Sequence, residues 1–169
     1  QTGNENVARA YAEIIKHTYK ADVEITCGGS ARPTYIAQVA SAADRLRILA
    51  LIDFGISETV IDRSLFVKDC CIQSFIRGAF LACGNVSDPN KEYHAEFPVK
   101  NPVLARELYE LLCDVGLSPK MSVRGKNTIV YFKESENIED LLTTIHATNH
   151  TLELAGIKVY KDMRNHYNR

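Results

Sequence analysis

An internal repeat is the feature of this sequence that most restricts how the chain can fold. Segment 6–15 (NVARAYAEII) resembles segment 103–112 (VLARELYELL), about 97 residues further along. In each segment apolar residues recur at three- and four-residue spacing, which predicts a helix. A short alternating stretch follows each helix, at 22–25 and at 120–123, and predicts a strand. A repeat of this length is typical of duplicated half-domains.

The second copy begins and ends at recognisable signals. Asn101 can cap a helix whose first residue is Pro102, where a missing N–H costs nothing, and Gly116 is well placed to end it. Further along, polarity alternates on both sides of the segment 125–127 (GKN), which predicts a hairpin with that turn. A last helix with one apolar face is expected over residues 137–147.

The second copy also has a front half. Residues 68–83 predict a mostly apolar helix, and 85–87 and 93–97 predict two strands joined by the turn 88–90 (DPN). The complete unit is therefore helix, two strands, helix, two strands, helix.

The first copy lacks this front half, because it begins at the middle helix and continues with strand 35–39 and helix 44–51. Either another chain supplies the missing helix and hairpin, or one side of the sheet is left incomplete. We therefore predict an α+β fold whose first repeat is truncated at its N-terminus. Its parts are the C-terminal half of repeat 1 (1–56), a linker (57–67), a complete repeat 2 (68–157) and the start of a second linker (158–169).

Tandem units of this order resemble the LAGLIDADG homing endonucleases, and the segment 76–84 (IRGAFLACG) matches the family's signature nonapeptide. The resemblance implies tandem αββαββα repeats that form an antiparallel, saddle-shaped sheet backed by helices. In that family the nonapeptide helices cross at the centre, and each presents a metal-binding acid at its carboxyl end. The residues expected to pack the helix here are Gly78, Ala79, Ala82, Cys83 and Gly84. Gly78 would permit close helix approach, and Gly84 would turn the chain out of the helix.

At the two positions where the family's nonapeptide has acids, this sequence has residues without side-chain oxygen atoms. The residue before the last glycine is Cys83, and the other acid falls on Leu81. Hard cations such as Mg²⁺ need oxygen ligands, which neither side chain supplies. We therefore expect no catalytic residue, no metal site and no cofactor in this half, and no enzymatic activity.

A second resemblance is more specific. Segments 75–89 (FIRGAFLACGNVSDP) and 161–169 (KDMRNHYNR) are similar to the WhiA regulators, and the likeness extends over nearly the whole chain. It implies a bacterial transcription factor of cell division, chromosome segregation and sporulation, with a helix-turn-helix domain beyond residue 169. The partners so implied are DNA, bound weakly here or through that further domain, and another transcription regulator.

The saddle face of the family lies on DNA, so cations on its strands are the natural contacts. The candidates are Lys120, Arg124 and Lys126 around one hairpin, with Arg32 in the equivalent loop of the first copy. A simpler interpretation is that these cations are solvent-exposed residues at a hairpin tip. We favour it because hairpin tips are usually polar. The acidic residues that would repel phosphate are Glu24, Glu96 and Glu134.

The net charge and the cysteine content indicate the DNA affinity and the cellular compartment that we expect for this chain. The net charge is −1, which argues against strong non-specific DNA binding by this segment. The five cysteines form no CxxC pair and fit structural thiols in a reducing cytosol. No segment predicts a signal peptide or a membrane span. His146 and His150 have a spacing that can hold zinc, but their predicted place at a helix C-terminus also suits histidine.

We therefore expect a non-catalytic regulatory and DNA-binding domain in the cytoplasm, associated with the nucleoid. Two alternatives stay open. One is an active LAGLIDADG homing endonuclease whose other half holds the metal, and the other is a purely protein-interaction domain.

Overall fold

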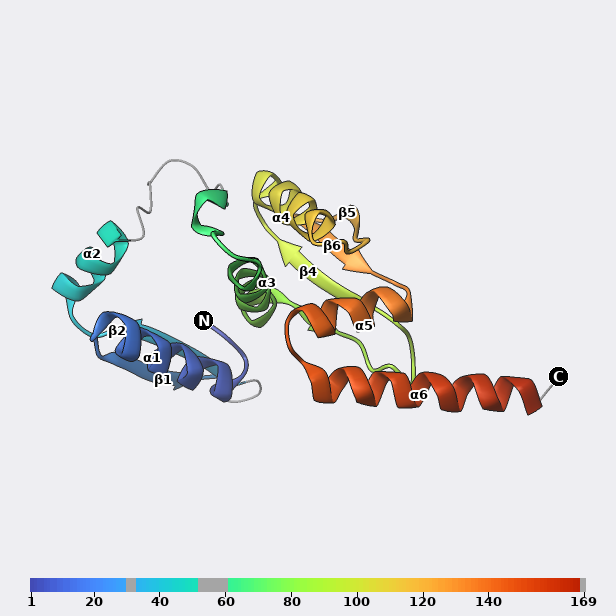
Figure 1. Ribbon diagram of the computed structural model, residues 1–169. Coiled ribbons are helices and arrows are strands. Elements are labelled where there is room, and N and C mark those ends of the chain that lie inside the picture. Colours follow the sequence, from blue (N-terminus) through green and yellow to red (C-terminus); the bar gives the residue numbers. More distant parts are fainter. Residues whose placement is uncertain (30–32, 52–60, 168–169) are drawn as a thin grey trace. The chain divides into compact units, whose positions relative to one another are not determined.

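The computed structural model describes residues 1–29, 33–51 and 61–167 (Figure 1). The chain divides into two compact units, Gln1–Glu58 and Thr59–Arg169. Each unit has its own hydrophobic core.

The first unit is a two-stranded antiparallel sheet with two helices. Its elements are α1 (Glu5–Tyr19), β1 (Val23–Gly28), β2 (Thr34–Val39) and α2 (Ala42–Leu51). Asn4 caps α1 by accepting a hydrogen bond from the backbone N–H of Asn6, and Lys20 ends the helix in the left-handed region. The predicted order of helix, two strands and helix is confirmed for this copy.

The second unit contains the complete repeat and one further helix. Its elements are a 3₁₀ turn (Arg63–Leu65), α3 (Asp69–Cys83), β3 (Asn85–Val86), β4 (Ala95–Val99), α4 (Pro102–Asp114), β5 (Lys120–Arg124), β6 (Asn127–Phe132), α5 (Ser135–Thr144) and α6 (Thr148–Tyr167). The sheet has the order β3-β4-β6-β5, and every pairing is antiparallel. The predicted order is confirmed, and α6 follows it.

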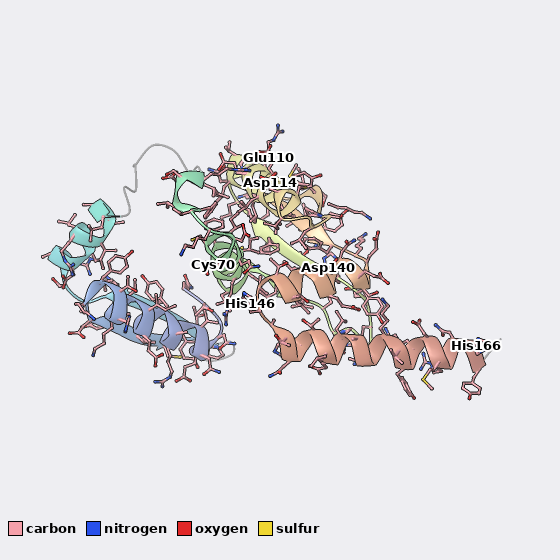
Figure 2. All side chains as sticks on the ribbon, viewed as in Figure 1. Cys70, Glu110, Asp114, Asp140, His146 and His166 are labelled. Atoms are coloured by element: carbon pink, nitrogen blue, oxygen red, sulfur yellow. The ribbon has the colours of Figure 1, made fainter. Side chains whose placement is uncertain are left out.

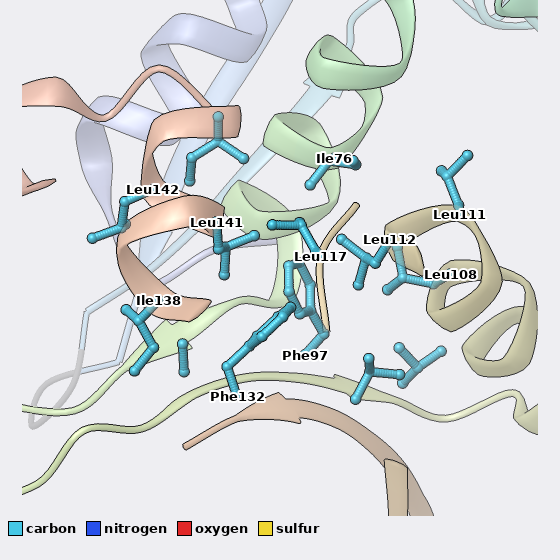
Figure 3. Packing of buried hydrophobic residues seen from close by; sticks show 14 of the residues in the cluster. Ile76, Phe97, Leu108, Leu111, Leu112, Leu117, Phe132, Ile138, Leu141 and Leu142 are labelled. Atoms are coloured by element: carbon cyan, nitrogen blue, oxygen red, sulfur yellow. The ribbon is translucent and has the colours of Figure 1, made fainter. Parts of the chain in front are cut away.

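Strand alternation forms the core of the second unit. Ala95 and Phe97 of β4 pair with Phe132 and Val130 of β6, so all four side chains point to the same face of the sheet, and all are buried. Helices α3, α4 and α5 contribute Ile76, Leu112 and Leu141 to the same cluster. Figure 3 shows Phe97 and Phe132 in contact range of these helices, which lie on one side of the sheet. The opposite face, called the open face, carries the partly exposed Glu96 and Tyr131 and the buried Ile129.

The signals predicted around α4 are confirmed. The Asn101 side chain accepts hydrogen bonds from the N–H groups of Val103 and Leu104, and Gly116 follows the helix with a φ of 84°. The predicted hairpin turn was one residue too long, because Asn127 pairs with Arg124 and belongs to β6. Gly125 makes the tighter two-residue turn possible with a φ of 62°.

Two other predicted boundaries were displaced. Strand β4 runs to Val99 and includes Pro98, which is tolerated because β3 pairs with β4 only at residues 95 and 96. Helix α5 ends at Thr144 rather than at residue 147. It ends there because the N–H of Ala147 bonds back to the carbonyl of Leu142, which places His146 in the left-handed region with a φ of 59°.

The segments expected to be linkers contain ordered structure. Residues 158–167 continue α6, in which no proline interrupts the twenty residues of the helix. At the other linker, Ile61 is buried in the second core, and its N–H donates to Glu107. Residues 52–60 of the first boundary lie outside the described residues.

The two copies differ in what surrounds their equivalent helices. Leu108 and Leu111 of α4 are 4% and 2% exposed, because both belong to the core of the second unit. The matching residues of α1, Tyr11 and Ile14, are 43% and 61% exposed. The middle helix therefore buries this face in the larger core of the second unit but not in the smaller core of the first.

We predict that truncating the two equivalent side chains will have unequal effects. Leu111→Ala should destabilise the second unit by about 2–5 kcal/mol, because it leaves a cavity in a packed core. Ile14→Ala should change the stability of the first unit by less than about 0.5 kcal/mol, because that side chain is mostly exposed. Hydrogen-exchange mass spectrometry reports the two units separately. Equal loss of protection in α1 and α4 would contradict the assignment of the two cores.

An ion pair joins α5 to α6, and its effect on a pKa leads to a second prediction. The Lys158 ammonium donates a hydrogen bond to Glu136 at 2.5 Å and holds the pKa of that carboxyl at about 2, below its ordinary 4.5. Because the folded pKa is the lower one, this stabilisation is present above pH 4.5 and is lost as the pH falls toward 2. Lys158→Gln should return the pKa of Glu136 toward 4.5, as measured by NMR titration of the side-chain carboxyl. A pKa unchanged by the substitution would rule out Lys158 as its cause.

Candidate nucleic-acid interface

The open face of the second sheet carries a polar surface. Strand register places Glu96 of β4, Tyr131 of β6 and Lys120 of β5 in one row, and it places Ser122 and Arg124 on the same side. Every residue of β5 is exposed. Strands presented in this way can contact a ligand with side chains from several rows.

The cations of this hairpin have different partners. Lys120 pairs with Glu134 at 3.1 Å, and Arg124 lies 3.5 Å from Glu96. Lys126 is exposed at the turn, and no ion pair joins it to any residue that the structure describes. Lys120, Arg124 and Lys126 are called the hairpin cations below. The pair of Lys120 and Glu134 is exposed on both sides, and Arg124 is itself 68% exposed, so both cations can exchange a carboxylate for a phosphate.

A second cluster on this face was not predicted from the sequence. His94 lies 3.0 Å from Glu96, and both side chains are less than one-fifth exposed. The ring of His94 packs against that of Tyr131, and the Lys133 ammonium lies 5.5 Å from the Tyr131 ring centroid. His94 directly precedes β4, and its spacing of two residues from Glu96 is a signal in the sequence for this pair. The neighbours on β6 depend on strand register, which the sequence does not give.

The acidic residues on this face are partly neutralised. Glu96 faces both His94 and Arg124, and Glu134 faces Lys120. In the first unit, register places Glu24 on the side of the sheet away from the core, beside Gln38. Arg32, the fourth predicted DNA contact, lies outside the described residues.

Helix α3 contains the nonapeptide, in which Cys83 and Leu81 occupy the positions of the family's acids. Cys83 is half-buried, its thiol donates to the carbonyl oxygen of Ala79 at 3.4 Å, and burial raises the pKa of the thiol. The thiol is therefore protonated at neutral pH. Leu81 is 46% exposed and has a hydrocarbon side chain. Neither residue offers an oxygen to a cation.

The glycines of this helix have different environments. Gly84 ends α3 with a φ of −67°, so it is not in the left-handed region. An added Cβ there would lie 2.3 Å from the Phe80 ring, so lack of space, rather than backbone conformation, requires glycine. Gly78 has no described atom within 4 Å of such a Cβ, and with Ala82 it lies on an exposed part of the helix. Its expected contact with a second helix stays a prediction.

Potential metal ligands are dispersed over the second unit. Figure 2 shows Cys70, Asp140 and His166 on three different helices. His146 lies between α5 and α6 with its ring 3.1 Å from Gln73, whereas His150 faces Glu153 within α6. Within the described ranges, no three His, Cys, Asp or Glu side chains gather as a metal site. No described helix has the length and apolar character that crossing a membrane demands.

The fold is similar to that of a homing endonuclease. A structure of mesophilic variants of the homing endonuclease I-DmoI superposes with a TM-score of 0.58 and 15% identity, covering 84% of this chain and 75% of that one. The N-terminal LAGLIDADG domain of DUF199/WhiA superposes with a TM-score of 0.62 and 20% identity, covering 84% and 68%. The chain therefore has the α+β LAGLIDADG homing-endonuclease-like fold.

Sequence comparisons then define the family. The family model of the WhiA LAGLIDADG-like domain matches residues 72–164. A protein of Alkaliphilus metalliredigens named probable cell division protein WhiA is 35% identical over 99% of this chain and 56% of its own length. The protein of the same name from Clostridium tetani is 44% identical over 70% of this chain and 36% of its own length. The chain belongs to the WhiA family, and it spans about half the length of the first of these relatives.

The buried thiol leads to a prediction about reactivity. At pH 7.5, Cys83 should react with iodoacetamide more slowly than Cys70, because its raised pKa and partial burial disfavour the thiolate, whereas Cys70 is exposed. Time-resolved mass spectrometry of tryptic peptides measures both rates in one sample. If Cys83 reacts as fast as Cys70, the position of the lost acid is open to solvent and ions, contrary to the structure.

Proposed function

We propose that this chain is a non-catalytic regulatory domain that binds DNA weakly through the open sheet face of its second unit. The whole protein would be a bacterial transcription factor of cell division, chromosome segregation and sporulation, associated with the nucleoid in the cytoplasm. In this proposal a helix-turn-helix domain elsewhere in that protein reads the promoter, and another transcription regulator is a partner. The family assignment and the names of the relatives support a role in cell division.

The proposal that the domain is non-catalytic rests on the side chains at the C-terminal end of α3. Metal-dependent phosphodiester cleavage needs oxygen ligands that place a cation at the scissile phosphate. Here the equivalent positions hold a protonated thiol, Cys83, and a hydrocarbon, Leu81. A loss of both acids from one half would leave the central site without half of its ligands.

The DNA-binding part is supported by the exposed hairpin. Lys120 and Arg124 lie on a strand whose residues are all exposed, and Lys126 lies in the exposed turn that follows, so phosphates can approach all three. Partial pairing with Glu96 and Glu134 and a net charge of −1 indicate weak binding. A purely protein-interaction surface is the alternative, and it is favoured by the same acidic neighbours.

A salt-dependent titration separates these functions. With duplex DNA at low salt, we expect a dissociation constant in the micromolar range that weakens steeply with added salt. Changing Lys120, Arg124 and Lys126 together to Ala should weaken binding and reduce the slope of log K against log salt by about 3. A matched control changes Lys16, Lys68 and Arg106 to Ala, because these exposed cations lie outside the sheet. Absence of binding even at low salt would support the protein-interaction alternative, and equal losses in both variants would remove the hairpin from the interface.

The nuclease alternative needs its own assay. Full-length protein incubated with supercoiled plasmid and Mg²⁺ or Mn²⁺ should leave the plasmid intact. Metal-dependent nicking that disappears when an acidic residue is mutated would overturn the non-catalytic proposal. The binding titration is independent of this result.

A further inference from the structure

The second unit contains a cavity that the proposed function does not use. It has a volume of about 510 Å³ and lies where the C-terminal half of α3, strand β3, the end of α5 and the start of α6 meet. Apolar side chains make most of its wall: Phe80, Leu81, Val86, Leu142, Ile145 and Leu154. Small-molecule sites typically have volumes of roughly 300–1,000 Å³ and linings of this kind.

A few polar groups lie at the same cavity. They are Arg77 of α3, His146 of the junction between α5 and α6, and His150 and Glu153 of α6. The one acid among them, Glu153, is 3.5 Å from His150. Arg77 is exposed, and it forms no ion pair with any residue in the described part of the chain. The Arg77 guanidinium is therefore available to bind a carboxylate through two parallel hydrogen bonds.

The backbone at the cavity is also unusual. His146 occupies the left-handed position that ends α5, a place where glycine is usual. Its ring is held 3.1 Å from Gln73 of α3, so one nitrogen has a partner within the protein. A non-glycine residue in this conformation is strained, and such residues often occur at ligand sites. The strained position brings an imidazole to the polar side of an apolar cavity.

We propose that this cavity binds a small organic acid with an apolar body, such as a medium-chain carboxylate. The carboxylate contacts Arg77, with His146 and His150 beside it, and the hydrocarbon lies against Phe80, Leu142 and Leu154. Charge complementarity selects an anion, because Arg77 has no ion-pair partner among the described residues and the acid Glu153 is 67% exposed to water, which screens its charge. The apolar wall selects a ligand with a hydrocarbon body over inorganic phosphate. This ligand site goes beyond DNA binding and does not depend on it.

An NMR titration with octanoate tests the site, with 1-octanol as the uncharged probe of equal chain length. Octanoate should shift the backbone amides of Leu81, Val86 and Ala147 with a dissociation constant of about 1 mM or lower, and octanol should bind roughly tenfold more weakly. Arg77→Gln should weaken octanoate binding by about tenfold and leave octanol unchanged. Arg106→Gln is the matched control, because Arg106 is exposed on α4 and does not line the cavity.

A second pair of variants tests the location. Leu81→Trp adds bulk at the cavity and should abolish the octanoate shifts, whereas Leu152→Trp, at an exposed position of α6 outside the cavity, should leave them. Both positions are partly exposed, so neither substitution removes core packing. The proposal is overturned if octanoate shifts no amide around the cavity, if octanol binds equally well, or if Arg77→Gln and Leu81→Trp behave like their controls.

Discussion

The second unit depends on one arrangement, the burial of alternate side chains from β4 and β6 beneath its helices. Ala95, Phe97, Val130 and Phe132 all point to the same face, and a register slip by one residue would reverse every one of them. Burying that face against Ile76 and Leu141 fixes which side of the sheet stays open. The position of the polar surface, with Lys120 and Arg124 on it, follows from this packing.

The same packing shows which contacts hold helix α3 in this homing-endonuclease-like fold. Helix α3 is held by the contacts of Ile76 and Phe80 with the core, and Phe80 also packs edge-to-face on Phe97. None of these contacts needs the acids of the nonapeptide. Gly84 is required by the Phe80 ring rather than by a metal. The packing of helix α3 therefore does not depend on an acid at the positions of Leu81 and Cys83.

The sequence predicted most of the fold because its signals are local. Helical spacing, the cap at Asn101 and the turn at Gly125 act over a few residues, and the structure places all of them as expected to within a few positions. The errors lie where distant contacts decide: the end of α5 at His146 and the extension of α6 through the expected linker. The cluster of His94, Glu96 and Tyr131 was missed because strand register determines it. The hairpin cations could be identified from the sequence by their residue types. Their ion pairs with Glu96 and Glu134 could not be identified, because these contacts depend on the fold.

We propose that this domain contacts DNA through its open sheet face and without a metal ion. An NMR titration with short duplex DNA, run once in EDTA and once in Mg²⁺, tests this proposal. We expect amide shifts that are concentrated on β5 and β6 and that are the same in both conditions. Shifts that require Mg²⁺ and centre on the C-terminal end of α3 would contradict it.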